Sequence, residues 1–186
     1  MVSKRTLEIL SVISYPTNIV IPLIIAFSWK IPDILVAVLF ISVIPFLLTA
    51  FYAKEEKVNV DIFEQKKRSI PFVVGMALFA IGAVVLNYMG AHLLYTLSIS
   101  YLLVTLALFL INIKWKISVH CAGMAGVATD ATYIFGLSAI PLFFLVPVIA
   151  WVRYKIHSHT IGQLIAGSIV SIVISLFVFS VFYPIL

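Results

Sequence analysis

The stretch Arg153-Tyr-Lys-Ile-His-Ser-His159-Thr-Ile-Gly-Gln163 stands between two apolar runs, and the second run continues toward Leu186. Membrane-spanning segments rarely tolerate a guanidinium, two imidazoles and an amide, because each costs free energy in hydrocarbon. The stretch therefore predicts a polar connection at a membrane surface that leads into a membrane helix. Its ionisable groups are candidates for function.

The composition places the whole chain in the membrane. Of its 186 residues, 63% are hydrophobic and 10% are charged, which is typical of polytopic membrane proteins. Backbone groups must hydrogen-bond internally in hydrocarbon, so we expect an all-α transmembrane bundle of six or seven helices in a single integral membrane domain, residues 1–186. The apolar runs lie at 8–29, 33–53, 70–90, 92–113, 117–136, 138–153 and 160–184.

Two alternatives are disfavoured at this point. The first run continues to Trp29 without a small-residue cleavage site, so we expect a retained helix and not a signal peptide. Cys121 is the single cysteine, which excludes an intrachain disulfide and a cysteine-based metal cluster.

The basic residues give the topology. Seven spans would place eleven of the twelve Lys and Arg residues on one face, which predicts that this face is cytoplasmic. The net charge of +5 then reports topology, and we expect no nucleic-acid partner. The eleven are Lys4, Arg5, Lys54, Lys57, Lys66, Lys67, Arg68, Lys114, Lys116, Arg153 and Lys155.

Three polar clusters fall on this predicted face: residues 64–71, 116–120 and 153–163. Together they hold several cations, two imidazoles and the Ser118 hydroxyl. Fixed positive charge and free amides near helix N-termini suit a phosphate group. Ser118 is a predicted N-cap, which leaves the first amides of its helix available to an anion.

The clusters resemble the motifs of the type 2 phosphatidic acid phosphatase superfamily, which includes the vanadium haloperoxidases. The family carries Lys-x6-Arg-Pro, Pro-Ser-Gly-His and Ser-Arg-x5-His-x3-Asp. The third motif stands here as Val152-Arg153-x5-His159-x3-Gln163, and the second as Ile117-Ser118-Val119-His120. For the first, Lys66, Lys67 and Arg68 precede Pro71 without the family spacing. The resemblance covers about residues 60–170, in a phosphatase-like core of about 60–175.

The resemblance implies a role for each matched residue. His159 would be the nucleophile that forms a phosphohistidine, and Gln163 stands where the family has the aspartate that orients it. His120 would protonate the leaving alkoxide. The phosphoryl group would be held by Arg153, Arg68, Lys67, Ser118 and Lys116. The implied substrate is a lipid phosphate or an isoprenoid (di)phosphate of phospholipid metabolism, and no cofactor or metal is implied.

Other hypotheses remain open. Gln163 and the altered motifs also fit a non-catalytic lipid-phosphate-binding or transporter-like protein. An intramembrane metal enzyme would use His120, His157, His159 and Asp130. Asp130 lies in the middle of a span, where it either hydrogen-bonds structurally or lines a polar cleft. The oligomeric state is open.

Overall fold

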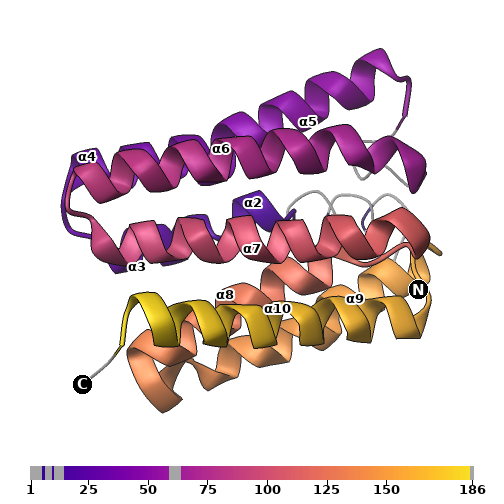
Figure 1. Cartoon of the computed structure of the whole chain (residues 1–186). Coiled ribbons are helices and arrows are strands. Elements are labelled where there is room, and N and C mark those ends of the chain that lie inside the picture. Colours follow the sequence, from indigo (N-terminus) through magenta and orange to yellow (C-terminus); the bar gives the residue numbers. More distant parts are fainter. Residues whose placement is uncertain (1–5, 7–9, 11–14, 59–63, 185–186) are drawn as a thin grey trace.

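The computed structural model describes residues 6, 10, 15–58 and 64–184. Every regular element in these ranges is helical, which confirms the predicted all-α fold. The helices lie side by side along one common direction and form a bundle (Figure 1). Lys4, Arg5 and much of the predicted first span lie outside the described residues.

The N-terminal part is a series of short helical segments. They are α2 (Pro16–Ile19), α3 (Ile21–Phe27), α4 (Ile31–Ala37), the π-helical η1 (Val38–Val43) and α5 (Ile44–Glu55). A proline stands in the first turn of α2, α3 and α4, where the N–H that proline lacks would be one of the amides without a helical partner, whereas Pro45 follows η1 inside a continuous helix, and π-helical turns commonly accommodate such a local break. The described part of the predicted span at 8–29 is thus two short helices, whereas the predicted span at 33–53 is one continuous helical segment, Ile31–Glu55, with the π-helical turn η1 inside it.

The middle of the chain is a helical hairpin. The 3-10 turn η2 (Lys66–Arg68) leads into α6 (Ser69–Tyr88), which packs along α7 (His92–Lys114). Gly90 joins them with a φ of 72°, in the left-handed region that glycine adopts without steric cost. The predicted boundary near residue 91 is confirmed.

A second hairpin follows. Helix α8 (Val119–Phe135) ends at Gly136, whose φ of 68° turns the chain into the 3-10 segment η3 (Gly136–Phe144) and α9 (Leu145–Lys155). Both η3 and α9 pack against α8, so the chain folds back on itself here. The last helix, α10 (Ile161–Phe182), packs along α8 and α7.

Five helical segments in the described part are long and apolar enough to cross a membrane, which makes the chain a multi-pass membrane protein by length and composition. They are Ile31–Glu55, Lys66–Tyr88, His92–Lys114, Val119–Lys155 and Ile161–Phe182, with the shorter apolar segment Pro16–Phe27 before them. The segment Val119–Lys155 contains the reversal at Gly136.

Helix α8 is central because its small residues let neighbouring helices approach closely. A Cβ on Gly123 would lie 2.7 Å from Pro16 Cβ, and one on Gly126 would lie 2.7 Å from Ser171 Oγ. Small residues at helix interfaces allow this packing in membranes, where apolar contact with lipid is equally favourable. The small residues of α8 therefore bring α2 and α10 into close contact with it.

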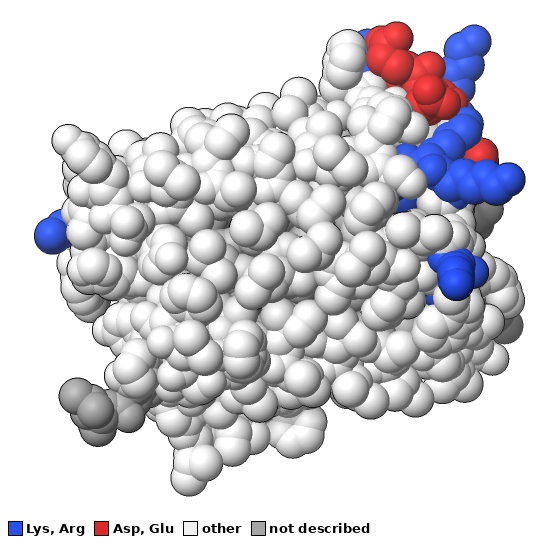
Figure 2. Space-filling model, in the orientation of Figure 1, with Lys and Arg blue, Asp and Glu red and all other residues white. Residues whose placement is uncertain are grey.

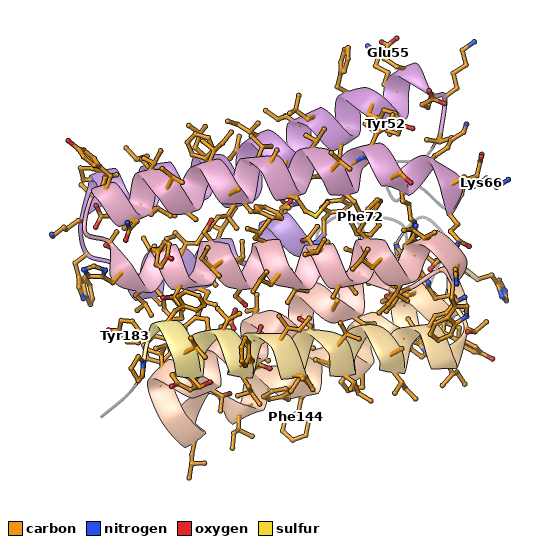
Figure 3. All side chains as sticks on the ribbon, viewed as in Figure 1. Tyr52, Glu55, Lys66, Phe72, Phe144 and Tyr183 are labelled. Atoms are coloured by element: carbon orange, nitrogen blue, oxygen red, sulfur yellow. The ribbon has the colours of Figure 1, made fainter. Side chains whose placement is uncertain are left out.

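The charged residues gather at one end of the bundle, with Lys and Arg concentrated there in Figure 2. Lys66 and Glu55 lie at this end in Figure 3, and Tyr183 lies at the opposite end. The predicted charge asymmetry therefore holds for the described residues. We call this end of the bundle, with Arg68, Lys116 and His159, the charged end.

Candidate functional site

The three polar clusters meet at the charged end. Arg68, which closes η2, donates from Nη1 to the carbonyl of Ile117 at 2.9 Å. The amide of Ser118 donates to the carbonyl of Gln163 at 3.3 Å. These two hydrogen bonds tie the start of α6, the start of α8 and the first turn of α10 together.

The loop between α9 and α10 brings His159 back toward Arg153. His157 adopts a φ of 55°, which reverses the chain after α9. The amide and the hydroxyl of Ser158 then both donate to the carbonyl of Arg153, at 3.1 and 2.8 Å. These bonds satisfy a carbonyl at the end of α9 that would otherwise lack a helical partner.

The orientation of His159 is set by a capping box at the start of α10. Thr160 Oγ1 accepts from the amide of Gln163 at 3.4 Å, and Gln163 Oε1 accepts from the amide of Thr160 at 3.1 Å. The same Oε1 lies 3.2 Å from His159 Nδ1. Because a carbonyl oxygen only accepts, Nδ1 carries the proton and Nε2 carries the lone pair.

The imidazole of His159 is buried, and its surroundings favour the neutral form. The side chain is 6% exposed, and Nε2 has no hydrogen-bond partner among the described residues. Burial first, and then the positive charges of Arg68, Arg153 and Lys116, lower the pKa of His159 from 6.5 to about 2. A neutral imidazole with a free Nε2 lone pair is the form that acts as a nucleophile.

Three cations act electrostatically on this imidazole: Arg68, Arg153 and Lys116. Arg153 is completely buried and Arg68 nearly so, whereas Lys116 is half-buried. Burial and the neighbouring charges of Arg68 and Arg153 lower the pKa of Lys116 from 10.5 to about 8. Several positive charges that repel one another favour binding of an anion, and guanidinium groups match the geometry of a phosphate.

The predicted N-cap at Ser118 is confirmed. Ser118 is fully buried, and its Oγ accepts from the amide of Cys121 at 3.3 Å. A Cβ on Gly167 would collide with the carbonyl oxygen of Ser118, so α10 approaches the start of α8 as closely as a glycine allows. This contact fixes the distance between Ser118 and the loop that holds His159.

Two predicted site residues have further contacts of their own. Lys67 forms ion pairs with Glu56 at 3.4 Å and Glu64 at 3.7 Å, and it is not among the cations that act on His159. His120 is buried in the first turn of α8, where its ring meets Tyr15 edge-on at a centroid distance of 5.4 Å. With Arg68, it lines a cavity inside the bundle.

Some site residues were missed by the sequence reasoning. The Thr160-Ile-Gly-Gln163 pattern is itself a capping-box signal before an apolar run and could have identified Thr160. Gln65 and Asn112 exchange two hydrogen bonds, Gln65 Nε2 to Asn112 O at 2.5 Å and Asn112 Nδ2 to Gln65 O at 3.1 Å. These bonds hold the chain just before η2 against the last turns of α7. No local sequence pattern predicts such a pair.

The metal-enzyme hypothesis has no geometric support in the described ranges, which contain no group of three His, Cys, Asp or Glu side chains able to hold a metal ion. His157 is exposed in the loop. Asp130 lies about 15 Å beyond His120 along α8, from the helical rise over ten residues.

Comparison of the chain with protein-family models, with curated proteins and with solved structures gave no match. The functional conclusion therefore depends on the geometry of the site and on the motif resemblance.

Proposed function

We propose that this chain is a membrane-embedded phosphatase that hydrolyses a lipid phosphate or an isoprenoid (di)phosphate through a phosphohistidine at His159. The observation that carries the proposal is the hydrogen bond that joins His159 Nδ1 to Gln163 Oε1 and leaves the buried Nε2 without a partner among the described residues. Arg68, Arg153 and Lys116 supply the positive charge that a phosphoryl group requires.

In the proposed first step, His159 Nε2 attacks phosphorus and the bond from phosphorus to the lipid oxygen breaks. The leaving alkoxide takes a proton from His120, giving a free alcohol and a phosphohistidine. In the second step, water attacks phosphorus, the nitrogen–phosphorus bond breaks, and His120 recovers a proton from that water. The products are inorganic phosphate and the starting enzyme.

Gln163 supplies orientation without charge. Its Oε1 keeps the proton on Nδ1, as an aspartate would, but it does not stabilise the positive imidazole that forms during attack. We expect a slower phosphorylation step than a carboxylate would support. Gln163 therefore fixes the tautomer of His159 but does not accelerate the phosphorylation step through charge.

The charged end is proposed to face the cytoplasm, because basic residues accumulate on the cytoplasmic side of membrane proteins. A lipid phosphate in the cytoplasmic leaflet would then present its headgroup at the level of Lys116 and Arg153. The apolar helix faces around them suit the lipid chains.

The test is phosphate release from detergent-dispersed phosphatidic acid, phosphatidylglycerophosphate, and prenyl mono- and diphosphates. We expect release from at least one substrate, and its loss in His159→Ala. The matched control is His157→Ala, which removes an exposed imidazole two residues away and should keep the activity. No release from any substrate by folded wild-type protein would refute the proposal.

The second candidate is a non-catalytic protein that binds lipid phosphates at the same cations. The burial of Nε2 and the neutral Gln163 favour it. It predicts that His159→Ala keeps lipid-phosphate binding and that Arg153→Gln weakens it. Binding without phosphate release would select this candidate.

A further inference from the structure

A cavity of about 110 Å³ extends inside the bundle among α2, α5, α6, α7, α8 and α10. Arg68 and His120 line it toward the charged end, and Asp130 lines it about 15 Å further along α8. Its walls between these points are largely apolar and include Phe72 and Leu108. The cavity thus connects the charged end with a carboxyl group deep in the membrane-spanning part.

Asp130 is 1% exposed, and neither carboxyl oxygen has a hydrogen-bond partner within 3.5 Å among the described residues, although the Ser175 hydroxyl lies close enough to interact with the carboxyl group. Hydroxyl groups of two neighbouring helices surround this part of the cavity: Ser100 and Tyr101 on α7, and Ser171 and Ser175 on α10. Ser100 Oγ and Ser175 Oγ lie 3.0 Å apart and share one hydrogen bond, in which one hydroxyl donates to the other.

A carboxylate in the interior of a membrane protein is costly without a compensating charge. The other ionisable side chains that line the cavity are Tyr15, Arg68, Tyr101 and His120. Arg68 and His120 lie at the far end, and Tyr101 uses its hydroxyl to donate to the carbonyl of Pro16 at 3.3 Å. The charge on Asp130 therefore calls for a cation that comes from outside the protein.

We propose that Asp130, with the hydroxyls of Ser100 and Ser175, forms an intramembrane binding site for a monovalent cation, a proton or Na⁺. One carboxylate neutralises one positive charge, whereas a divalent ion would leave a net charge in an apolar environment. Oxygen ligands suit a hard cation such as Na⁺, and a proton needs the carboxylate alone.

The cavity provides the path for exchange. A water molecule needs roughly 10–15 Å³ of such space, so the cavity has room for several waters between Asp130 and the charged end. Hydrated in this way, it would let the cation exchange with the aqueous phase without crossing the whole membrane. Cation binding at Asp130 involves no phosphate hydrolysis, although Arg68 and His120 of the proposed phosphatase site line the same cavity.

The test uses dicyclohexylcarbodiimide, which modifies protonated carboxyl groups in apolar surroundings, on the full-length protein in detergent. The modified residue is identified by mass spectrometry after digestion. Asp130→Asn removes the expected site, and Asp33 is an internal control, because this buried carboxyl lies 3.4 Å from Ser28 Oγ. Labelling is measured against pH and against NaCl, with choline chloride holding the ionic strength constant.

We expect Asp130 to be labelled, and we expect the extent of labelling to depend on the cation that is bound. If Na⁺ is the cation, NaCl at ten times its dissociation constant should reduce labelling about tenfold. If the cation is a proton, labelling should fall with rising pH and should not depend on the NaCl concentration. No labelling of Asp130 in folded protein, or labelling independent of both pH and NaCl, would overturn the proposal.

A second variant tests the hydroxyl contribution. Ser175→Ala removes one proposed ligand and leaves the carboxyl in place. We expect the midpoint of the NaCl or pH titration to move by about threefold in cation concentration or more. An unchanged midpoint would contradict the assignment of this hydroxyl. Because the assay measures no phosphate release, its failure is distinguishable from failure of the proposed phosphatase activity.

Discussion

Lys116 should make anion binding at the charged end dependent on pH in the alkaline range. Its pKa is lowered to about 8 by burial and by the charges of Arg68 and Arg153. Lys116 is therefore protonated below that pH and loses its charge above it. A pKa of about 8 leaves roughly 90% of the side chain protonated at pH 7 and roughly 10% at pH 9.

The size of the effect follows from this titration. If a phosphate group binds only when Lys116 is protonated, its dissociation constant rises about tenfold between pH 7 and pH 9. A smaller rise would mean that Arg68 and Arg153 supply most of the attraction. The ligand should be an alkyl monophosphate, whose second pKa of about 6 leaves it dianionic throughout this range.

The assay is equilibrium binding of this ligand to detergent-solubilised protein across the pH range. Lys116→Arg should abolish the pH dependence, since arginine stays protonated. Lys67→Met is the matched control, because Lys67 is occupied by Glu56 and Glu64 and its loss should leave the pH dependence intact. A tenfold rise that persists in Lys116→Arg would refute the reasoning.

Three further predictions concern the site and the topology. Gly167→Ala should destabilise the protein by about 1–3 kcal/mol, because the new Cβ would collide with the Ser118 carbonyl. Gly162→Ala should be tolerated, because its Cβ would meet only the ring of Trp115 at 3.8 Å. Thermal unfolding of the two variants compares their stability. Gln163→Leu should lower the free energy of unfolding by about 1 kcal/mol, because the capping box is lost, and should abolish most phosphate release. Gln163→Glu should keep the capping box, and unfolding and turnover measurements compare the two variants. Lys54→Cys should react with an impermeant maleimide only in opened cells, since the native Cys121 is buried; labelling from outside would contradict the orientation.

The fold was largely predictable because it depends on the length and position of apolar runs. Gly90 and Gly136 interrupt those runs, and both stand at observed helix ends with a positive φ. Ser118 was predictable as an N-cap because a capping serine acts locally on the next turn. The convergence of three polar clusters followed from their placement at the same end of successive spans.

The detailed site was less predictable because hydropathy does not define how a helix is rotated about its axis. His120 follows Ser118 by two residues, yet its ring meets Tyr15 and lines the internal cavity. Lys67 adjoins Arg68 but turns to Glu56 and Glu64. These orientations depend on side chains distant in sequence, which no motif spacing records.

The surroundings of Asp130 show the same limit. The sequence identifies a carboxyl in mid-span but leaves open whether it hydrogen-bonds structurally or lines a cleft. Its neighbours Ser100 and Ser175 come from two other helices and meet only after the bundle has packed. The structure places Asp130 on the cavity, beside the Ser175 hydroxyl and with no hydrogen bond to its carboxyl within 3.5 Å among the described residues.

The central claim is that His159 is a nucleophile, and the most direct test is to trap the phosphoenzyme. Purified protein is mixed briefly with a radiolabelled lipid phosphate, quenched in alkali, in which phosphohistidine survives, and digested for mass spectrometry. We predict an acid-labile phosphoryl group on the peptide that contains His159, and none in His159→Ala. A protein that releases phosphate without any phosphoryl group on this peptide would contradict the claim.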